Sequence, residues 1–391
     1  MQEVCKGFAR ERAQTEEPIM GILSIGAAHD LPGAVDLTAP GAFVWWYCDL
    51  VDAQGDGVVL VTFMGLPFLA GYHEGRERPC DRPGLNFVVY RGGKPTFYLL
   101  QEHAHAHANV TLLPQEWLWE FGESRLRLEW KGDDVTLTAA LDLEVPGSRE
   151  RCRVALDVTG PASRIAATDG DPRHHWCPIA PTATGHVTVD TGSDAGWTLE
   201  GRAYLDANTS RVPLSQLGLS SWQWGRIAFP ERELIFYAMT PESGGPEEPL
   251  VLSVRPGQAA TIDEKTPFMW GPKRHQRYGL TWNESVTLRC PQGHVVCVKV
   301  LHVVEKGPFY LRFLIEARCE TTGETGRGFA ELVDVARIDR PWQRPFVRMR
   351  THRASGPNSA WVPLFNGPRS GRAMRLLRHW FGVSLAPGAG P

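Results

Sequence analysis

FVWWYCDLVD (residues 43–52) and GVVLVTFMG (57–65) are two largely apolar runs joined by the turn residues AQGDG (53–57). Short runs rich in β-branched and aromatic residues, separated by Gly and Asp, are typical of β-hairpins. The same pattern continues through most of the chain and predicts an all-β protein. Further predicted strands are LNFVVYRG (85–92), RLRLEW (125–130), VTLTAALDLEV (135–145), GHVTVD (185–190), WTLEGRAYLD (197–206), ELIFYAMT (233–240), PLVLSVRP (249–256), VTLRC (286–290), VVCVKVLHVVE (295–305) and FYLRFLIEARCE (309–320).

Two breaks interrupt this series, one at the proline-rich segment 171–181 and one at a predicted loop, 207–220. Two β-barrel or sandwich halves in tandem are the simplest architecture that accommodates the breaks. The predicted divisions are an N-terminal extension with little structure (1–40), an N-terminal β-domain (41–200), a C-terminal β-domain (201–350) and a basic tail (351–391).

The composition is that of a globular protein and excludes several functional classes. Of 391 residues, 42% are hydrophobic and 22% are charged, with a net charge of −3. A protein that coats nucleic acid needs an excess of basic residues to neutralise phosphates, so no nucleic-acid partner is expected. The 14 tryptophans suggest an aromatic-lined apolar cavity. The eight cysteines lack CxxC spacing, which favours reduced, buried thiols.

The two ends of the chain bear on location. The first residues mix acids and bases and do not resemble a secretory signal, and the apolar stretch 58–70 is shorter than the roughly 20 residues of a membrane-spanning helix. We therefore expect a cytoplasmic protein. From residue 340 onward the chain has nine arginines and no acidic residue. Apolar side chains at helical spacing follow at Ala373, Leu376, Leu377, Trp380 and Phe381.

These features predict a basic amphipathic helix with Arg372, Arg375 and Arg378 on its polar face. Such a helix can lie in an anionic membrane interface. It can equally pack on a barrel with its basic face in solvent. The first alternative predicts peripheral contact with the inner membrane.

The nucleotide-binding, zinc-protease and hydrolase signatures GxGxxG, GxxxxGK[ST], HExxH and GxSxG are absent. One metal hypothesis remains, at His103, His105 and His107. On a strand these imidazoles would share one face and could converge on an ion. Same-face neighbours diverge on a flat strand, however, so we favour simple exposure and expect no metal.

A second group of residues suggests acid chemistry. Tyr204 and Asp206 are two apart on a predicted strand and therefore share a face. A carboxyl group among aromatic rings in an apolar cavity has a raised pKa and can act as a general acid. The aromatic residues around it are predicted to form the cavity wall and bind substrate, together with one arginine: Trp45, Trp46, Tyr47, Trp222, Trp224 and Arg226.

Several stretches resemble the carotenoid 1,2-hydratases (hydroxyneurosporene synthases) and their relatives with two lipocalin-like domains. The WWY cluster, an HxWxPIAP segment, a YxDxN turn and a WxWGR strand follow one another in the order of that family. The similarity covers most of residues 41–350. The matching stretches are residues 41–68, 173–181, 197–214, 220–229 and 328–350. Ser210 departs from the family, which usually has Gly after the YxDxN turn.

The resemblance implies two lipocalin-like β-barrel domains and addition of water to the terminal double bond of an acyclic carotenoid, without a cofactor. The family's important positions fall on His174, Trp176, Tyr204 and Asp206. Asp206 would protonate the alkene to a tertiary carbocation, with Tyr204 positioning the acid. His174 would orient the acid or activate water, while Trp176, Trp222 and Trp224 would shield the cation. Two alternatives stay open: a related cyclase or isomerase acting on another polyene or terpenoid, and a non-catalytic carrier of a hydrophobic ligand.

Overall fold

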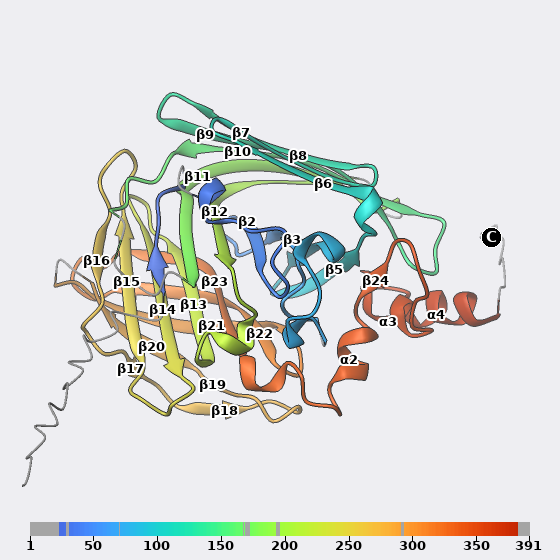
Figure 1. The fold of residues 1–391 in the computed structure, drawn as a ribbon. Coiled ribbons are helices and arrows are strands. Elements are labelled where there is room, and N and C mark those ends of the chain that lie inside the picture. The colour runs from blue at the N-terminus through green and yellow to red at the C-terminus, as the bar shows by residue number, and fades with distance from the viewer. Residues whose placement is uncertain are drawn as a thin grey trace, which may run out of the picture.

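The computed structural model describes residues 23–381, except 29–30, 70, 167, 169–172, 193–195 and 291–292. It confirms the predicted all-β fold: two large curled sheets face each other, and short helices follow at the C-terminal side (Figure 1). The strands of the first sheet are β1 (Ser24–Ile25), β2 (Phe43–Val51), β3 (Gly57–Met64), β4 (Pro83–Arg91), β5 (Lys94–Glu102), β6 (Ala108–Leu113), β7 (Glu116–Phe121), β8 (Ser124–Lys131), β9 (Asp134–Glu144), β10 (Arg151–Pro161), β11 (His174–Asp190), β12 (Trp197–Ser210), β24 (His352–Arg353) and β25 (Gly367–Pro368).

The second sheet follows in the chain. Its strands are β13 (Leu219–Ala228), β14 (Glu233–Pro241), β15 (Glu248–Val254), β16 (Thr261–Asp263), β17 (Met269–Trp270), β20 (Ser285–Arg289), β21 (Val295–Lys306), β22 (Tyr310–Cys319) and β23 (Thr325–Asp334), and a separate hairpin is formed by β18 (Lys273–His275) and β19 (Thr281–Asn283). The α-helices are α1 (Leu31–Ala34), α2 (Arg344–Arg348), α3 (Val362–Phe365) and α4 (Arg372–Phe381).

The strand order places β12 inside the first sheet. That sheet runs β24-β5-β4-β3-β2-β12-β11-β10-β9-β8-β7-β6, and the second runs β16-β15-β14-β13-β23-β22-β21-β20-β17. The chain passes from one sheet to the other between Ser210 and Leu219. The boundary predicted at residues 200 and 201 therefore falls within a strand, and the predicted loop 207–220 is shortened because β12 continues to Ser210.

From His174 onward the proline-rich segment is a strand rather than the predicted break. Pro178 and Pro181 both lie in β11, in the interior of the first sheet. The pairing of β11 with β12 shifts register between Pro178 and Ala180 and again between Ala180 and Ala183. Irregularities of this kind let a sheet accept residues that have no N–H to donate.

The N-terminal extension and the tail are both tied to the first sheet. β1 pairs in parallel with β11, and Leu31 is fully buried, so part of the extension predicted to have little structure is ordered. β24 and β25 pair with β5. The predicted helix near the end of the chain is confirmed as α4, and none of the described helices is long and apolar enough to cross a membrane.

Two details of the predicted elements were wrong. Arg375 is buried rather than solvated, and its guanidinium donates hydrogen bonds to main-chain carbonyl groups, including that of Ser370 at 2.8 Å. His105 and His107 belong to the 3₁₀ turn η4 (His105–His107), not to a strand. His103 is buried against Phe121 while the other two are not, so the three imidazoles do not share a strand face.

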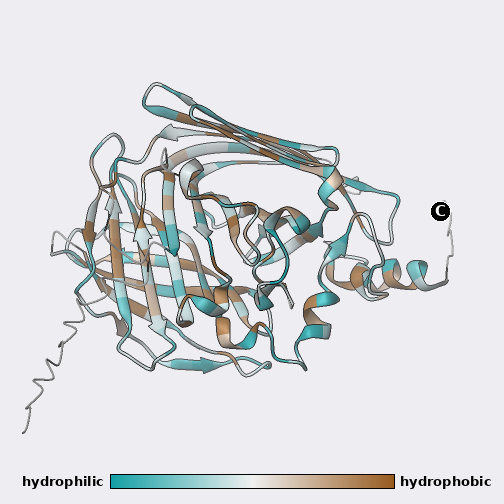
Figure 2. Cartoon of the chain, viewed as in Figure 1, coloured by the Kyte–Doolittle hydropathy of each residue, from teal (hydrophilic) through white to brown (hydrophobic). Residues whose placement is uncertain are grey.

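The alternation of side chains along β2 explains where the cores form. Hydrophobic and hydrophilic residues alternate along many strands (Figure 2), but β2 is buried on both faces. Trp46 and Cys48 belong to a cluster within the first sheet, whereas Trp45 and Tyr47 belong to a cluster that includes residues of both sheets. Successive side chains of a strand point to opposite faces, so one strand serves two cores.

Candidate active site

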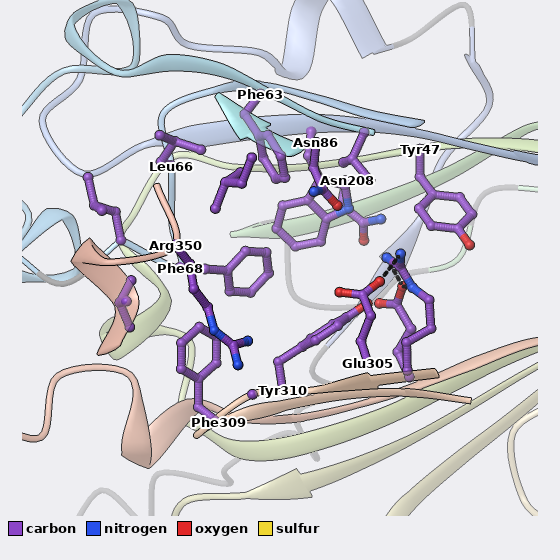
Figure 3. A pocket seen from close by; sticks show the side chains of 18 of the residues that line it. Tyr47, Phe63, Leu66, Phe68, Asn86, Asn208, Glu305, Phe309, Tyr310 and Arg350 are labelled. Atoms are coloured by element: carbon purple, nitrogen blue, oxygen red, sulfur yellow. Dashed lines mark hydrogen bonds and ion pairs between the residues drawn. The ribbon is translucent and has the colours of Figure 1, made fainter. Parts of the chain in front are cut away.

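A cavity of about 140 Å³ lies in the core shared by the two sheets (Figure 3). Its walls are mainly aromatic and aliphatic, with a small number of polar groups, as is usual for sites that bind hydrophobic ligands. Five of the residues singled out in the sequence line it, namely Trp45, Tyr47, Asp206, Trp222 and Trp224.

The side chain of Asp206 is held by two neutral donors. Trp176 Nε1–H and the Tyr204 hydroxyl both donate to Asp206 Oδ2, each at 2.8 Å. The other carboxyl oxygen, Oδ1, is buried and has no hydrogen-bond partner among the described residues. A proton on Asp206 is therefore best placed on Oδ1, because Oδ2 already accepts two hydrogen bonds.

Burial favours the protonated form of this carboxyl group. Desolvation is the main cause that raises the pKa of Asp206 to about 7, against the opposing effect of the hydrogen bonds from Trp176 and Tyr204. An aspartic acid with such a pKa is partly protonated at neutral pH and can donate its proton to a substrate.

Local structure accounts for this arrangement. Tyr204 and Asp206 share a face of β12, as their spacing predicted. Trp176 lies opposite Asn208 in the neighbouring strand β11. Its indole therefore reaches the carboxyl group from the side. No spacing along the sequence relates residue 176 to residue 206, so this contact depends on the register of the two strands.

Aromatic rings from both sheets meet at the cavity. The rings of Trp45 and Trp222 are stacked, with centroids 6.5 Å apart and planes at 11°. Trp224 packs against two tyrosines, with its ring centroid 5.2 Å from that of Tyr47 and 5.5 Å from that of Tyr204. The π faces of such rings attract positive charge.

Other predicted residues lie away from this cavity. Trp46 points to the opposite face of β2 and contacts Trp119, with ring centroids 5.1 Å apart. Arg226 is fully buried in ion pairs with Asp49 and Glu233. Neither Trp46 nor Arg226 is among the described residues that line this cavity.

His174 is buried behind the cavity wall. Its ring centroid lies 6.5 Å from that of Trp45, and neither His174 nor Trp176 is among the described residues that line the cavity. Trp176 contacts the cavity residue Asp206 through its indole N–H. His174 contacts the cavity residue Trp45 through its ring.

Sequence reasoning missed a polar group on the second sheet. Glu305, Tyr310, Arg312 and Glu331 come from β21, β22 and β23 and line the same cavity. Figure 3 shows Glu305 and Tyr310 in its wall. A signal was present, because Arg312 and Glu331 interrupt apolar strand segments, FYLRFLI and GFAELV. Charged residues in the middle of such segments are seldom buried without a partner.

The fold and the site together define a class: lipocalin-like proteins of two curled sheets that enclose an aromatic cavity with a protonatable carboxyl group. The family model for carotenoid hydratase CrtC matches residues 60–360. The chain belongs to this family.

Individual relatives agree with this assignment. The chain is 26% identical over 324 residues to the acyclic carotenoid 1,2-hydratase of Thiocapsa roseopersicina, covering 81% of this chain and 74% of that protein. It is 28% identical over 367 residues to the hydroxyneurosporene dehydrogenase of Chlorobaculum tepidum, covering 84% and 92%. Among solved structures, a Nitrosomonas europaea protein assigned as AttH aligns with a TM-score of 0.55 at 12% identity, covering 75% of this chain and 93% of that one. That likeness concerns the fold alone.

Proposed function

We propose that this protein adds water to the terminal double bond of an acyclic carotenoid, with Asp206 as the proton donor. The observation that carries the proposal is the state of Asp206: a buried carboxyl group whose Oδ2 accepts two neutral hydrogen bonds and whose Oδ1 has no partner among the described residues. This oxygen belongs to a residue that lines an aromatic cavity. Relatives named as acyclic carotenoid 1,2-hydratases support the choice of substrate.

The proposed reaction begins with transfer of the Oδ1 proton to the less substituted alkene carbon. This leaves a tertiary carbocation, which the faces of Trp222, Trp224 and Tyr47 stabilise. Water then bonds to the cationic carbon and gives up a proton. Hydration is neither a redox reaction nor a group transfer, so the steps as written need no cofactor.

The roles of the other buried residues follow from their contacts. Tyr204 and Trp176 fix the carboxyl group by holding Oδ2, which leaves Oδ1 for the substrate. His174, whose ring is next to Trp45, supports the cavity wall. A cavity of about 140 Å³ accommodates the end of a long polyene and not its whole length.

We propose that helix α4 brings the protein to the lipid in which such a substrate is dissolved. Met374, Leu377 and Trp380 are 46%, 42% and 42% exposed, and Trp361, 43% exposed, packs on Trp380 with ring centroids 4.7 Å apart. Exposed arginines flank this patch at 372 and 378. Apolar and aromatic side chains beside basic ones suit an anionic bilayer surface.

The membrane proposal is tested by sedimentation with vesicles of mixed anionic and zwitterionic lipid. The variant Leu377→Ser, Trp380→Ser should bind at least about 10-fold more weakly, since each lost apolar contact with lipid costs on the order of 1 kcal/mol or more. Leu113→Ser, which changes a 51% exposed leucine on β6, is the matched control. Equal binding by all three proteins would contradict a role for α4.

The hydratase proposal is tested with the full chain and dispersed lycopene or neurosporene, by mass spectrometry of the pigment. The wild type should add one or two molecules of water. Asp206→Asn should lower the rate at least about 100-fold, because loss of a general acid has effects of this order. Asp157→Asn, an exposed aspartate on β10 of the same sheet, is the control.

The outcomes separate the candidate functions. A rearranged pigment of unchanged mass would favour a cyclase or isomerase. Tight pigment binding that is the same in wild type and Asp206→Asn, without turnover, would favour a carrier. Either result overturns the hydratase proposal.

A further inference from the structure

A second carboxyl group lines the cavity from the opposite sheet. Glu331 lies on β23, across from Trp224 of β13 and Arg312 of β22. It lines the same cavity as Asp206. Glu331 Oε1 accepts two hydrogen bonds from Arg312, from Nε at 3.0 Å and from Nη2 at 2.8 Å. A carboxyl group that is bound to a guanidinium in this way carries its negative charge.

The other oxygen of Glu331, Oε2, is available to a molecule in the cavity. No hydrogen bond to Oε2 is found among the described residues, and the side chain is 15% exposed. Further polar atoms in the cavity wall are buried without partners in the described part of the chain: Asp206 Oδ1, Asn208 Oδ1, Trp224 Nε1 and Tyr310 Oη. Such a set of donors and acceptors can hold a water molecule.

The two carboxyl groups are close enough to affect each other. The negative charge of Glu331 contributes to the raised pKa of Asp206. The partners of the two groups differ, because Asp206 has neutral donors and Glu331 has a guanidinium. Environments that keep one carboxyl group neutral and the other charged are characteristic of acid and base pairs.

We propose that Glu331 accepts the proton released by the attacking water. This inference rests on the proposed hydratase function and completes its reaction. Asp206 Oδ1 gives its proton to the alkene carbon, and a C–H bond forms as the π bond breaks. The water oxygen bonds to the resulting cation, and one of its O–H bonds breaks as the proton moves to Glu331 Oε2. A proton then returns from Glu331 to Asp206 through water, which restores both groups.

Glu316 provides a control of the same residue type. It lies on β22, the strand next to that of Glu331, and its Oε2 pairs with Nη2 of Arg327 at 3.4 Å. Its side chain is 44% exposed, and it is not among the described residues that line the cavity. Glu316→Gln therefore removes a paired carboxylate from the second sheet without changing the cavity.

The test measures hydration of dispersed lycopene by the full chain, with kcat and KM determined separately. Glu331→Gln should lower kcat about 100-fold or more and leave KM within about threefold, the pattern of a group that acts in the transition state. Glu316→Gln should keep kcat within about twofold. Glu331→Asp keeps the charge but withdraws the carboxylate by one methylene group, and it should lower kcat at least about 10-fold.

Each outcome decides the inference. Equal kcat values for Glu331→Gln and Glu316→Gln overturn it, while hydration by the wild type still supports the proposed function. If Glu331→Gln does not fold, as judged by its unfolding transition, Glu331→Asp decides, and a wild-type kcat in that variant overturns the inference. Absence of hydration by the wild type overturns the proposed function and this inference with it.

Discussion

Two tyrosine–aspartate pairs lie side by side in the first sheet, Tyr47 with Asp49 on β2 and Tyr204 with Asp206 on β12. The strands are antiparallel neighbours, so Tyr204 is opposite Asp49 and Asp206 is opposite Tyr47. In each pair the tyrosine hydroxyl donates to the aspartate two residues later, at 2.8 Å. Both aspartates are buried, with 0% and 3% exposure. The backbone and the first hydrogen bond are thus alike.

The pairs differ in the next partner of the carboxyl group. Asp49 receives the guanidinium of Arg226, which crosses from the second sheet, whereas Asp206 receives the neutral indole of Trp176. Burial disfavours an unpaired charge, so a buried acid without a charged partner has a raised pKa and holds its proton to higher pH. The comparison teaches that one partner side chain separates a structural carboxylate from a candidate acid.

The largest effect is expected from breaking the charged pair. Arg226→Met would leave Asp49 buried without its cation and Glu233 with only Arg202, at 4.0 Å, and both carboxyl groups are 0% exposed. The free energy of unfolding should fall by about 3–5 kcal/mol, measured by urea denaturation at pH 7. Arg327→Met removes a partly exposed pair with Glu316, and it should cost less than about 1 kcal/mol. Equal losses in the two variants would contradict the structural role of Arg226.

A second effect concerns stability at Asp206 and depends on pH. Because the pKa of Asp206 is raised from 3.8 to about 7 in the folded protein, the folded state holds a proton that the unfolded state releases between about pH 4 and 7. Wild-type stability is therefore lost as pH rises through this window. The free energy of unfolding of Asp206→Asn should therefore rise relative to that of wild type by up to about 4 kcal/mol between pH 4 and pH 8, at roughly 1.4 kcal/mol per pH unit.

Urea denaturation of both proteins at pH 4.5, 6 and 8 measures the difference between their free energies of unfolding. The other titrating groups are the same in both proteins, so their contributions cancel. Asp157→Asn, exposed on β10, should follow the wild type at every pH. If the difference in free energy of unfolding between Asp206→Asn and wild type is the same at every pH, Asp206 is ionised in the folded state. That result would contradict its role as the acid.

The contrast between the pairs also shows what the sequence could reveal. Alternation along each strand was enough to place Tyr204 with Asp206 and Trp45 with Tyr47, but only the pairing of β12 with β2 shows that both pairs lie on the same face of the sheet. It could not reveal that Trp46 faces a second core, because β2 is buried on both sides. The local sequence pattern indicates which residues share a face of a strand, but not which part of the protein packs against that face.

Contacts between distant strands were beyond prediction from local pattern. Arg226 reaches Asp49 across 177 positions of sequence. Arg226 was therefore assigned to substrate binding, and Glu331 was not assigned a role at all. The two prolines of β11 were interpreted as a break because the register shifts that accommodate them depend on the pairing of β11 with β12. Knowledge of strand order and register would have been needed in each case.

The smallest effect is expected from removing the feature that the two pairs have in common. The Tyr204 hydroxyl favours the ionised form of Asp206, so Tyr204→Phe should raise the pKa of Asp206 above about 7. Loss of one hydrogen bond, about 1 kcal/mol, should move the alkaline limb of the rate profile for hydration upward by somewhat less than one pH unit.

Tyr47→Phe is the control, because it removes the equivalent hydrogen bond to Asp49, which keeps its ion pair with Arg226. It should leave the limb in place even if it lowers the rate, because Tyr47 lines the cavity. If both variants shift the alkaline limb equally, the limb does not follow the pKa of Asp206 specifically. Asp206 would then not be distinguished from Asp49.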